Sequence, residues 1–110
     1  MSCEVSERDG ATIVTLSGDI DLDSSPAMRE SLMACVSSDS RVLVDMGAVS
    51  YIDSSGVANL VEAYRAAVDS NATFGLVNVS EAAMRVIELA KLDKVFSIFA
   101  SIEDGIAHAK

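Results

Sequence analysis

Segments typical of β-strands alternate with segments of helical periodicity along nearly the whole of this 110-residue chain. The first kind are short apolar runs rich in β-branched residues, and the second repeat apolar residues every three or four positions. Read in order, they predict the pattern β-β-α-β-α-β-α-β-α within one domain. Strands that alternate with helices form a largely parallel sheet, so the chain is expected to adopt an α/β fold.

The first two strands are predicted to form an antiparallel hairpin over residues 5–16, with its turn at Asp9-Gly10. Gly18 is expected to end the second strand. Short apolar runs predict three further strands, and the segment after the first of them is expected to be irregular because Gly47 interrupts it. The three runs are 42–44, 73–77 and 98–100, and the irregular segment is 46–52.

Four helices are expected, and the longest covers residues 54–70. The first begins at Ser24-Ser25-Pro26, where serine is a common cap and proline suits the first turn, and it is closed by 37–40. The third covers 81–91 behind Ser80, and the fourth starts at Ser101. The long helix is predicted to bury the stripe Val57, Leu60, Val61, Tyr64 and Val68, and to leave Asn59, Glu62, Arg65 and Asp69 outside it.

Acidic residues outnumber basic ones by 17 to 8, which gives a net charge of −9. Proteins that bind phosphate backbones cluster Lys and Arg, so a nucleic-acid partner is not expected. Cys3 and Cys35 lack the spacing of a redox or zinc site and are expected to be free thiols. With no evident leader and no apolar run long enough to insert into a bilayer, a cytoplasmic location is expected.

The most informative segment is Asp53-Ser54-Ser55-Gly56, between a predicted strand and the longest helix. In open α/β sheets, sites collect at the carboxyl ends of strands, and a helix N-terminus stabilises negative charge. Asp19 and Asp21 end another strand and are expected nearby. A phosphate on a hydroxyl here would be tolerated by the helix and repelled by carboxylates, as in a binding switch. The simpler interpretation is an ordinary helix cap.

Two other chemistries are weighed from the same residues. Asp19, Asp21 and Asp23 with Glu30 approach the spacing of a calcium loop, but Ser24 replaces the glycine of its sharp turn. A serine hydrolase would need a base, and the single histidine, His108, lies near the end of the chain. No catalytic residue, metal or cofactor is therefore expected, and the chain is not expected to be an enzyme.

The motifs together resemble the STAS domain, the fold of bacterial anti-sigma factor antagonists. They are Gly18-Asp19-Ile20-Asp21, 42–46, 51–57, 76–80 and 95–99, and the resemblance covers about residues 5–107. It implies a mixed, mostly parallel sheet with an N-terminal antiparallel hairpin and about four helices packed mainly on one side. Two positions depart from the usual pattern. Asp19 stands in place of a glutamate, and Asn59 stands where many members have an apolar residue.

The resemblance also implies a function and roles for residues. An anti-sigma factor serine kinase would phosphorylate Ser55; the unphosphorylated form would bind that kinase and release a sigma factor, and a serine phosphatase would reverse the modification. Asp53 would cap the helix and orient the hydroxyl, Ser54 would supply a second one, and Gly56 would keep the approach open. Partner contacts are expected at Asp19, Asp21, Asp53, Ser54, Gly56, Asn59 and Met84.

One alternative function and the oligomeric state stay open. Other STAS proteins are stand-alone subunits of ABC-type lipid transporters, held against the ATPase, or cytosolic parts of anion transporters. The edge strand of the first hairpin could pair with a copy of itself, so a monomer or a weak homodimer is expected.

Overall fold

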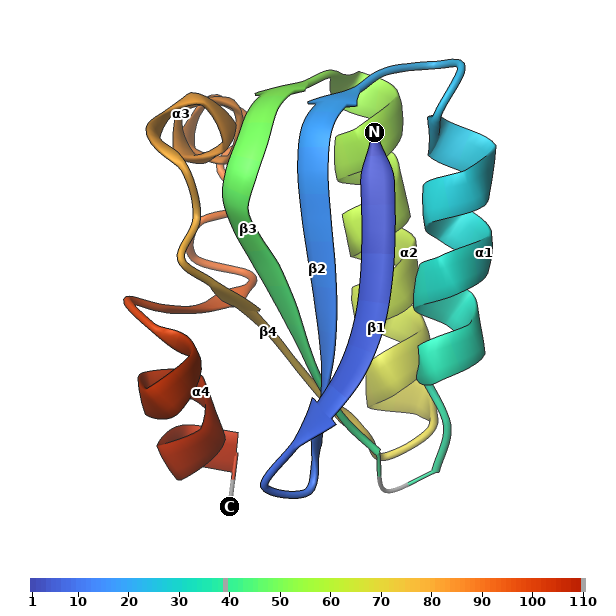
Figure 1. Ribbon diagram of the computed structural model, residues 1–110, viewed down its shortest axis with the longest axis vertical. Helices are drawn as coiled ribbons and strands as arrows, with labels where there is room; N and C mark the ends of the chain where they lie inside the picture. The colour runs from blue at the N-terminus through green and yellow to red at the C-terminus, as the bar shows by residue number, and fades with distance from the viewer. Residues whose placement is uncertain (39, 110) are drawn as a thin grey trace.

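The computed structural model describes residues 1–38 and 40–109, which form a five-stranded mixed sheet with four helices (Figure 1). The strands follow one another across the sheet in chain order. β1 (Ser2–Arg8) and β2 (Ala11–Ile20) are antiparallel, and each later strand runs parallel to its predecessor. The later strands are β3 (Arg41–Ile52), β4 (Thr73–Val77) and β5 (Ser97–Phe99). The predicted α/β fold and element order are confirmed.

The second and third strands are longer than predicted. β3 runs through the segment 46–52, because its ladder with β2 resumes after Gly47 and continues to the pair Ile20 and Ile52. Gly18 does not end β2. It lies inside the strand with a φ of +81°, next to a shift in register that lets the pairing continue. Both predictions failed because a glycine that breaks an isolated strand can be absorbed as a bulge within a sheet.

Three helices cover one face of the sheet, and the last helix covers the other. α1 (Ser25–Cys35) and α2 (Ser54–Asp69) pack against each other, while α3 (Glu81–Leu89) packs against β3. The main core lies between these helices and the sheet. α4 (Ile102–Ala109) closes a smaller core on the opposite face (Figure 1). The prediction of helices mainly on one side is confirmed.

α2 buries most of the predicted stripe and departs from the prediction at two positions. Val68 is 60% exposed, whereas Asn59 is only 6% exposed. The amide of Asn59 faces α1, where its Nδ2 donates to the Ser25 carbonyl at 2.8 Å and to Ser25 Oγ at 2.9 Å. These bonds satisfy the amide, so a polar side chain can occupy the helix interface.

The helix ends agree with prediction at three of four starts. Side chains of Asp53, Ser80 and Ser101 each accept a backbone N–H of the helix that follows. Ser24 precedes α1 but makes no such cap, because its hydroxyl accepts from Asp21 N instead. Of the segment predicted to close α1, Asp39 lies outside the described residues. Across the described chain, no helix has both the length and the apolar character needed to cross a membrane.

Candidate functional site

The start of α2 is joined to the end of β3 by a single residue, Asp53. Its Oδ1 accepts from Ser55 N at 3.0 Å, from Gly56 N at 3.3 Å and from Ser55 Oγ at 2.5 Å. The carboxylate thereby satisfies N–H groups that have no partner within the helix. The predicted cap is confirmed, and the Ser55 hydroxyl is held in one orientation by Asp53.

The Asp53 carboxyl has a lowered pKa. The hydrogen bond from the Ser55 hydroxyl is the main cause, and backbone N–H groups of Gly56, Ser55 and Leu22 act in the same direction against partial desolvation. Asp53 is therefore a carboxylate at neutral pH. The hydroxyl of Ser55, the candidate phosphoacceptor, is in direct contact with this negative charge.

Gly56 brings α2 against the strands and does not face the approach to Ser55. The residue is buried, and a Cβ added to it would lie 2.7 Å from Ile20 Cγ2 and 2.8 Å from Ile52 Cγ1. The expectation that Gly56 keeps the approach open is thus corrected. Its missing side chain allows the first turn of α2 to close onto the ends of β2 and β3.

The carboxyl ends of β2 and β3 meet beside this turn. Asp19 pairs in register with Tyr51, and the backbone N–H of Asp53 donates to the Ile20 carbonyl at 3.1 Å. Asp19 is exposed and accepts from Ser50 Oγ at 2.9 Å. Asp21 is half-buried in the turn that leads to α1. The expectation that Asp19 and Asp21 line the same end of the sheet as Ser55 is confirmed.

Two exposed apolar side chains at this end are not among the predicted site residues. Leu22 is 73% exposed, and its backbone N–H is one of the groups that lower the pKa of Asp53, while Tyr51 is 51% exposed beside Asp19. Exposed apolar side chains that are surrounded by polar ones are typical of protein-binding surfaces. The exposure of Tyr51 could have been predicted from the alternation of side chains along a strand. Because Ile52 is buried, the side chain of its neighbour Tyr51 must point away from the core.

A family model described as the STAS domain matches residues 2–105. The chain belongs to the STAS domain family. It is 26% identical over 106 residues to an anti-sigma-B factor antagonist of Bacillus subtilis, covering 96% of this chain and 97% of that protein. The expected family is confirmed, and its anti-sigma factor antagonists are regulatory binding proteins rather than enzymes.

The same fold occurs in solved structures of two kinds of protein, an anti-sigma factor antagonist and an anion transporter. An anti-sigma factor antagonist from Mycobacterium paratuberculosis superposes on this STAS domain with a TM-score of 0.88 and 28% identity, covering 98% of this chain and 92% of that one. A murine anion transporter of the Solute Carrier 26 family matches with a TM-score of 0.78 and 22% identity, covering 94% of this chain and 18% of the transporter. The second likeness concerns the fold alone.

The remaining predicted site residues lie in different surroundings in this STAS domain. Ser54 is exposed and Ser55 half-buried. Asn59 is part of the interface between α1 and α2, as described above, rather than of the open surface. Met84 is half-buried on α3, whose start is attached to β3 where Ser80 Oγ donates to the Val49 carbonyl at 2.7 Å.

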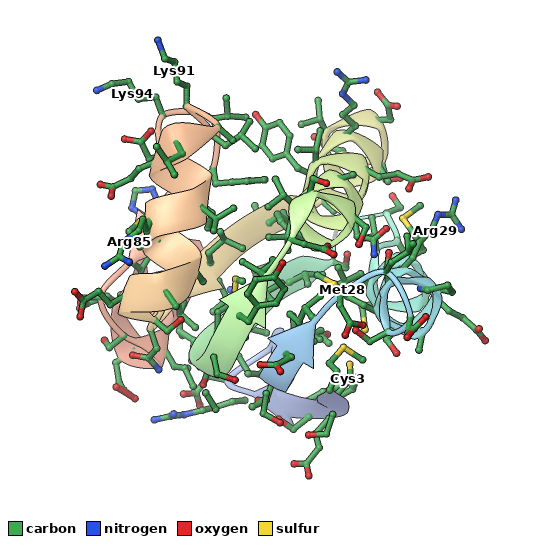
Figure 2. The ribbon with its side chains drawn as sticks, turned by 90° about the horizontal axis from the view of Figure 1, so that it is seen from above. Cys3, Met28, Arg29, Arg85, Lys91 and Lys94 are labelled. Atoms are coloured by element: carbon green, nitrogen blue, oxygen red, sulfur yellow. The ribbon has the colours of Figure 1, made fainter. Side chains whose placement is uncertain are left out.

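The Ser55 end of the STAS domain is rich in carboxylates. The basic residue of the neighbouring α1, Arg29, is committed to Glu62 of α2 by two hydrogen bonds of 2.9 and 2.7 Å. Figure 2 looks down on this end, and the labelled basic side chains lie around its periphery, on α1 and at the α3 side. A phosphate on Ser55 would therefore meet helix N–H groups together with aspartates.

The structure supports neither of the other chemistries weighed from the sequence. Within residues 1–38 and 40–109, no group of three or more His, Cys, Asp or Glu side chains is arranged to hold a metal ion. The His108 ring lies against that of Phe99, with centroids 5.1 Å apart and the planes tilted by 45°, and its helix lies on the opposite face of the sheet from α2. A histidine in that place cannot activate Ser55.

Proposed function

We propose that this STAS domain is an anti-sigma factor antagonist controlled by phosphorylation of Ser55. In its unphosphorylated form it binds an anti-sigma factor serine kinase in the cytoplasm and so frees a sigma factor. The observation that carries the proposal is the Ser55 hydroxyl, held by Asp53 at the mouth of α2 beside exposed Leu22 and Tyr51. The names of the bacterial relatives support the same class of partner.

The unphosphorylated surface combines apolar and acidic groups. Leu22 and Tyr51 provide area that a partner can bury, while Asp19, Asp21 and Ser54 provide polar contacts around them. A matching partner surface would be apolar at its centre and basic at its rim. The catalytic groups and ATP belong to the kinase, and this chain supplies the acceptor hydroxyl and needs no cofactor.

Phosphorylation would change this surface in two ways. The ester oxygen of phosphoserine can no longer donate to Asp53, so the hydrogen bond that orients Ser55 is lost. The phosphate also adds about −1.5 to −2 charges next to Asp53 and Asp19. Repulsion and a displaced side chain then weaken the complex, and a serine phosphatase restores the binding form.

Mass spectrometry of the intact chain tests the proposal. Incubation with the anti-sigma kinase of the host and ATP should add one phosphate, which Ser55→Ala abolishes. Ser54→Ala and Ser25→Ala are matched controls that should still accept it. Ser55→Asp should bind the kinase more weakly with an unchanged circular dichroism spectrum. A phosphate retained in Ser55→Ala, or equal affinity of Ser55→Asp, would contradict the proposal.

The alternative is a stand-alone STAS subunit of an ABC-type lipid or anion transporter, bound to its ATPase. In that case the chain would stay bound to an ATPase and would take no phosphate. Co-purification with an ATPase from the host, together with an unmodified mass after kinase treatment, would favour this function over the first. We propose that the chain is a monomer or a weak homodimer in either setting.

A further inference from the structure

The outer edge of β1 is open, and α1 lies beside it. Among residues 1–38 and 40–109, β1 is the first strand of the sheet and pairs only with β2, so within this part of the chain its other edge carries unpaired N–H and C=O groups. Six of its seven residues are exposed. Figure 1 shows α1 next to this edge, running in the same direction as the strand. The two elements thus frame a lateral surface distinct from the Ser55 end.

A hollow of about 540 Å³ separates the strand from the helix. It is lined by Val5 on β1 and by four small side chains and one glutamate of α1. The α1 residues are Ala27, Glu30, Ser31, Ala34 and Cys35. Burial raises the pKa of the Cys35 thiol, so this side chain stays neutral and adds to an apolar wall. Small residues on the helix leave room for the side chains of another segment.

We propose that this groove binds an extended segment of a partner protein, with alternating apolar and basic side chains, which adds to β1 as a further strand. Main-chain groups of β1 would pair with the segment, and its apolar side chains would enter the hollow between Val5 and Ala34. This interaction needs neither Ser55 nor its modification, so it is a second binding surface.

Charge decides between the two occupants that a free strand edge can take. Glu30 lies in the hollow, and Glu7 shares the face of β1 that carries Val5, because alternate residues of a strand point to the same side. A second copy of this chain would bring the same carboxylates and a net charge of −9. A basic segment meets opposite charges at the same positions.

Titration of the full ¹⁵N-labelled chain with two capped peptides tests the proposal. One alternates lysine with valine, and the other alternates glutamate with valine. The basic peptide should shift signals of Ser2–Arg8 and Ser25–Cys35 and slow the exchange of outward N–H groups of β1. The acidic peptide should bind at least about fivefold more weakly. Equal binding of both peptides, shifts elsewhere, or no shift at millimolar peptide would overturn the proposal.

Variants on exposed positions locate the contact. Glu30→Lys should lower the affinity for the basic peptide by about fivefold, and Ala34→Trp should fill the hollow and abolish binding of the peptide. Glu88→Lys makes the same charge change on α3 and should bind as the wild type does. Ser55→Asp should also bind normally, which separates this surface from the switch. A dimer mass in sedimentation equilibrium, together with NMR signals of β1 that shift with protein concentration, would assign the edge to a second copy and overturn the proposal.

Discussion

The tripeptide Asp-Ser-Ser occurs twice in this chain, each time before a helix, and the two copies behave differently. At 53–55 the aspartate caps α2 and holds the second serine. At 23–25 the aspartate is exposed, and Ser24 precedes α1 without capping it. Only in the second copy does a serine hydroxyl donate to the aspartate of the same tripeptide; in the first copy, Ser24 Oγ donates to Asp21, which precedes the tripeptide.

The difference comes from the neighbours of each copy. Gly56 follows the second copy and provides an N–H for Asp53 and a close approach to Ile20, whereas Pro26 follows the first and has no N–H to donate. β3 also ends directly before Asp53, while a turn separates β2 from α1. The candidate site therefore depends on the attachment of the helix to the sheet as much as on the three residues.

Replacing Gly56 should have the largest effect on this contrast. Gly56→Val places carbon atoms where Ile20 and Ile52 already lie, so we expect a loss of about 3 kcal/mol or more in the free energy of unfolding. Urea denaturation measures it. Pro26→Ala, at the equivalent position of the first copy, should change the same quantity by no more than about 1 kcal/mol. Similar losses in both variants would show that the two helix starts are equally anchored.

The contact between the two helix starts gives the next largest effect. Asn59→Ala removes both hydrogen bonds to Ser25 and should cost about 1–2 kcal/mol in urea denaturation. Ser25→Ala removes only the hydroxyl and should cost less. If Asn59→Ala were neutral, the amide would contribute nothing to holding the second Asp-Ser-Ser copy beside the first.

The caps themselves should differ by a smaller amount. Asp53→Ala leaves the Ser55 and Gly56 N–H groups without their acceptor, so its melting temperature should fall below that of the wild type. Asp23→Ala should leave the melting temperature nearly unchanged, because that carboxylate caps nothing in the described structure. Differential scanning calorimetry compares the two melting temperatures, and an equal fall in both variants would show that Asp23 stabilises its helix as much as Asp53 does.

The pH dependence of stability should show the smallest effect, and it tests the lowered pKa of Asp53 directly. The pKa of Asp53 is lowered in the folded chain, so its carboxylate stabilises the fold above the unfolded pKa of roughly 3.9. That contribution is lost as the pH falls through the folded pKa. The stability difference between wild type and Asp53→Asn should therefore be largest at neutral pH and narrow below about pH 4. A difference that widens in acid would contradict the lowered pKa.

The local pattern predicted the elements well where each signal was self-contained. The bounds of β4, the cap at Asp53 and the cap at Ser80 follow from residues adjacent in the chain. Predictions failed where a distant partner decides. The strand pairing of residues 46–52 depends on β2, and the burial of Asn59 depends on Ser25, 34 positions away.

By itself, the sequence determined the alternation of strands and helices, the family, and the serine at the start of the long helix, because these depend on local propensity and short motifs. Only the tertiary structure decided which Asp-Ser-Ser copy becomes an anchored cap, and that Leu22 and Tyr51 are exposed beside it. It also decided that the edge of β1 stays open next to α1. Those outcomes depend on which surfaces the parallel sheet brings together, and that information is spread over residues far apart in the chain.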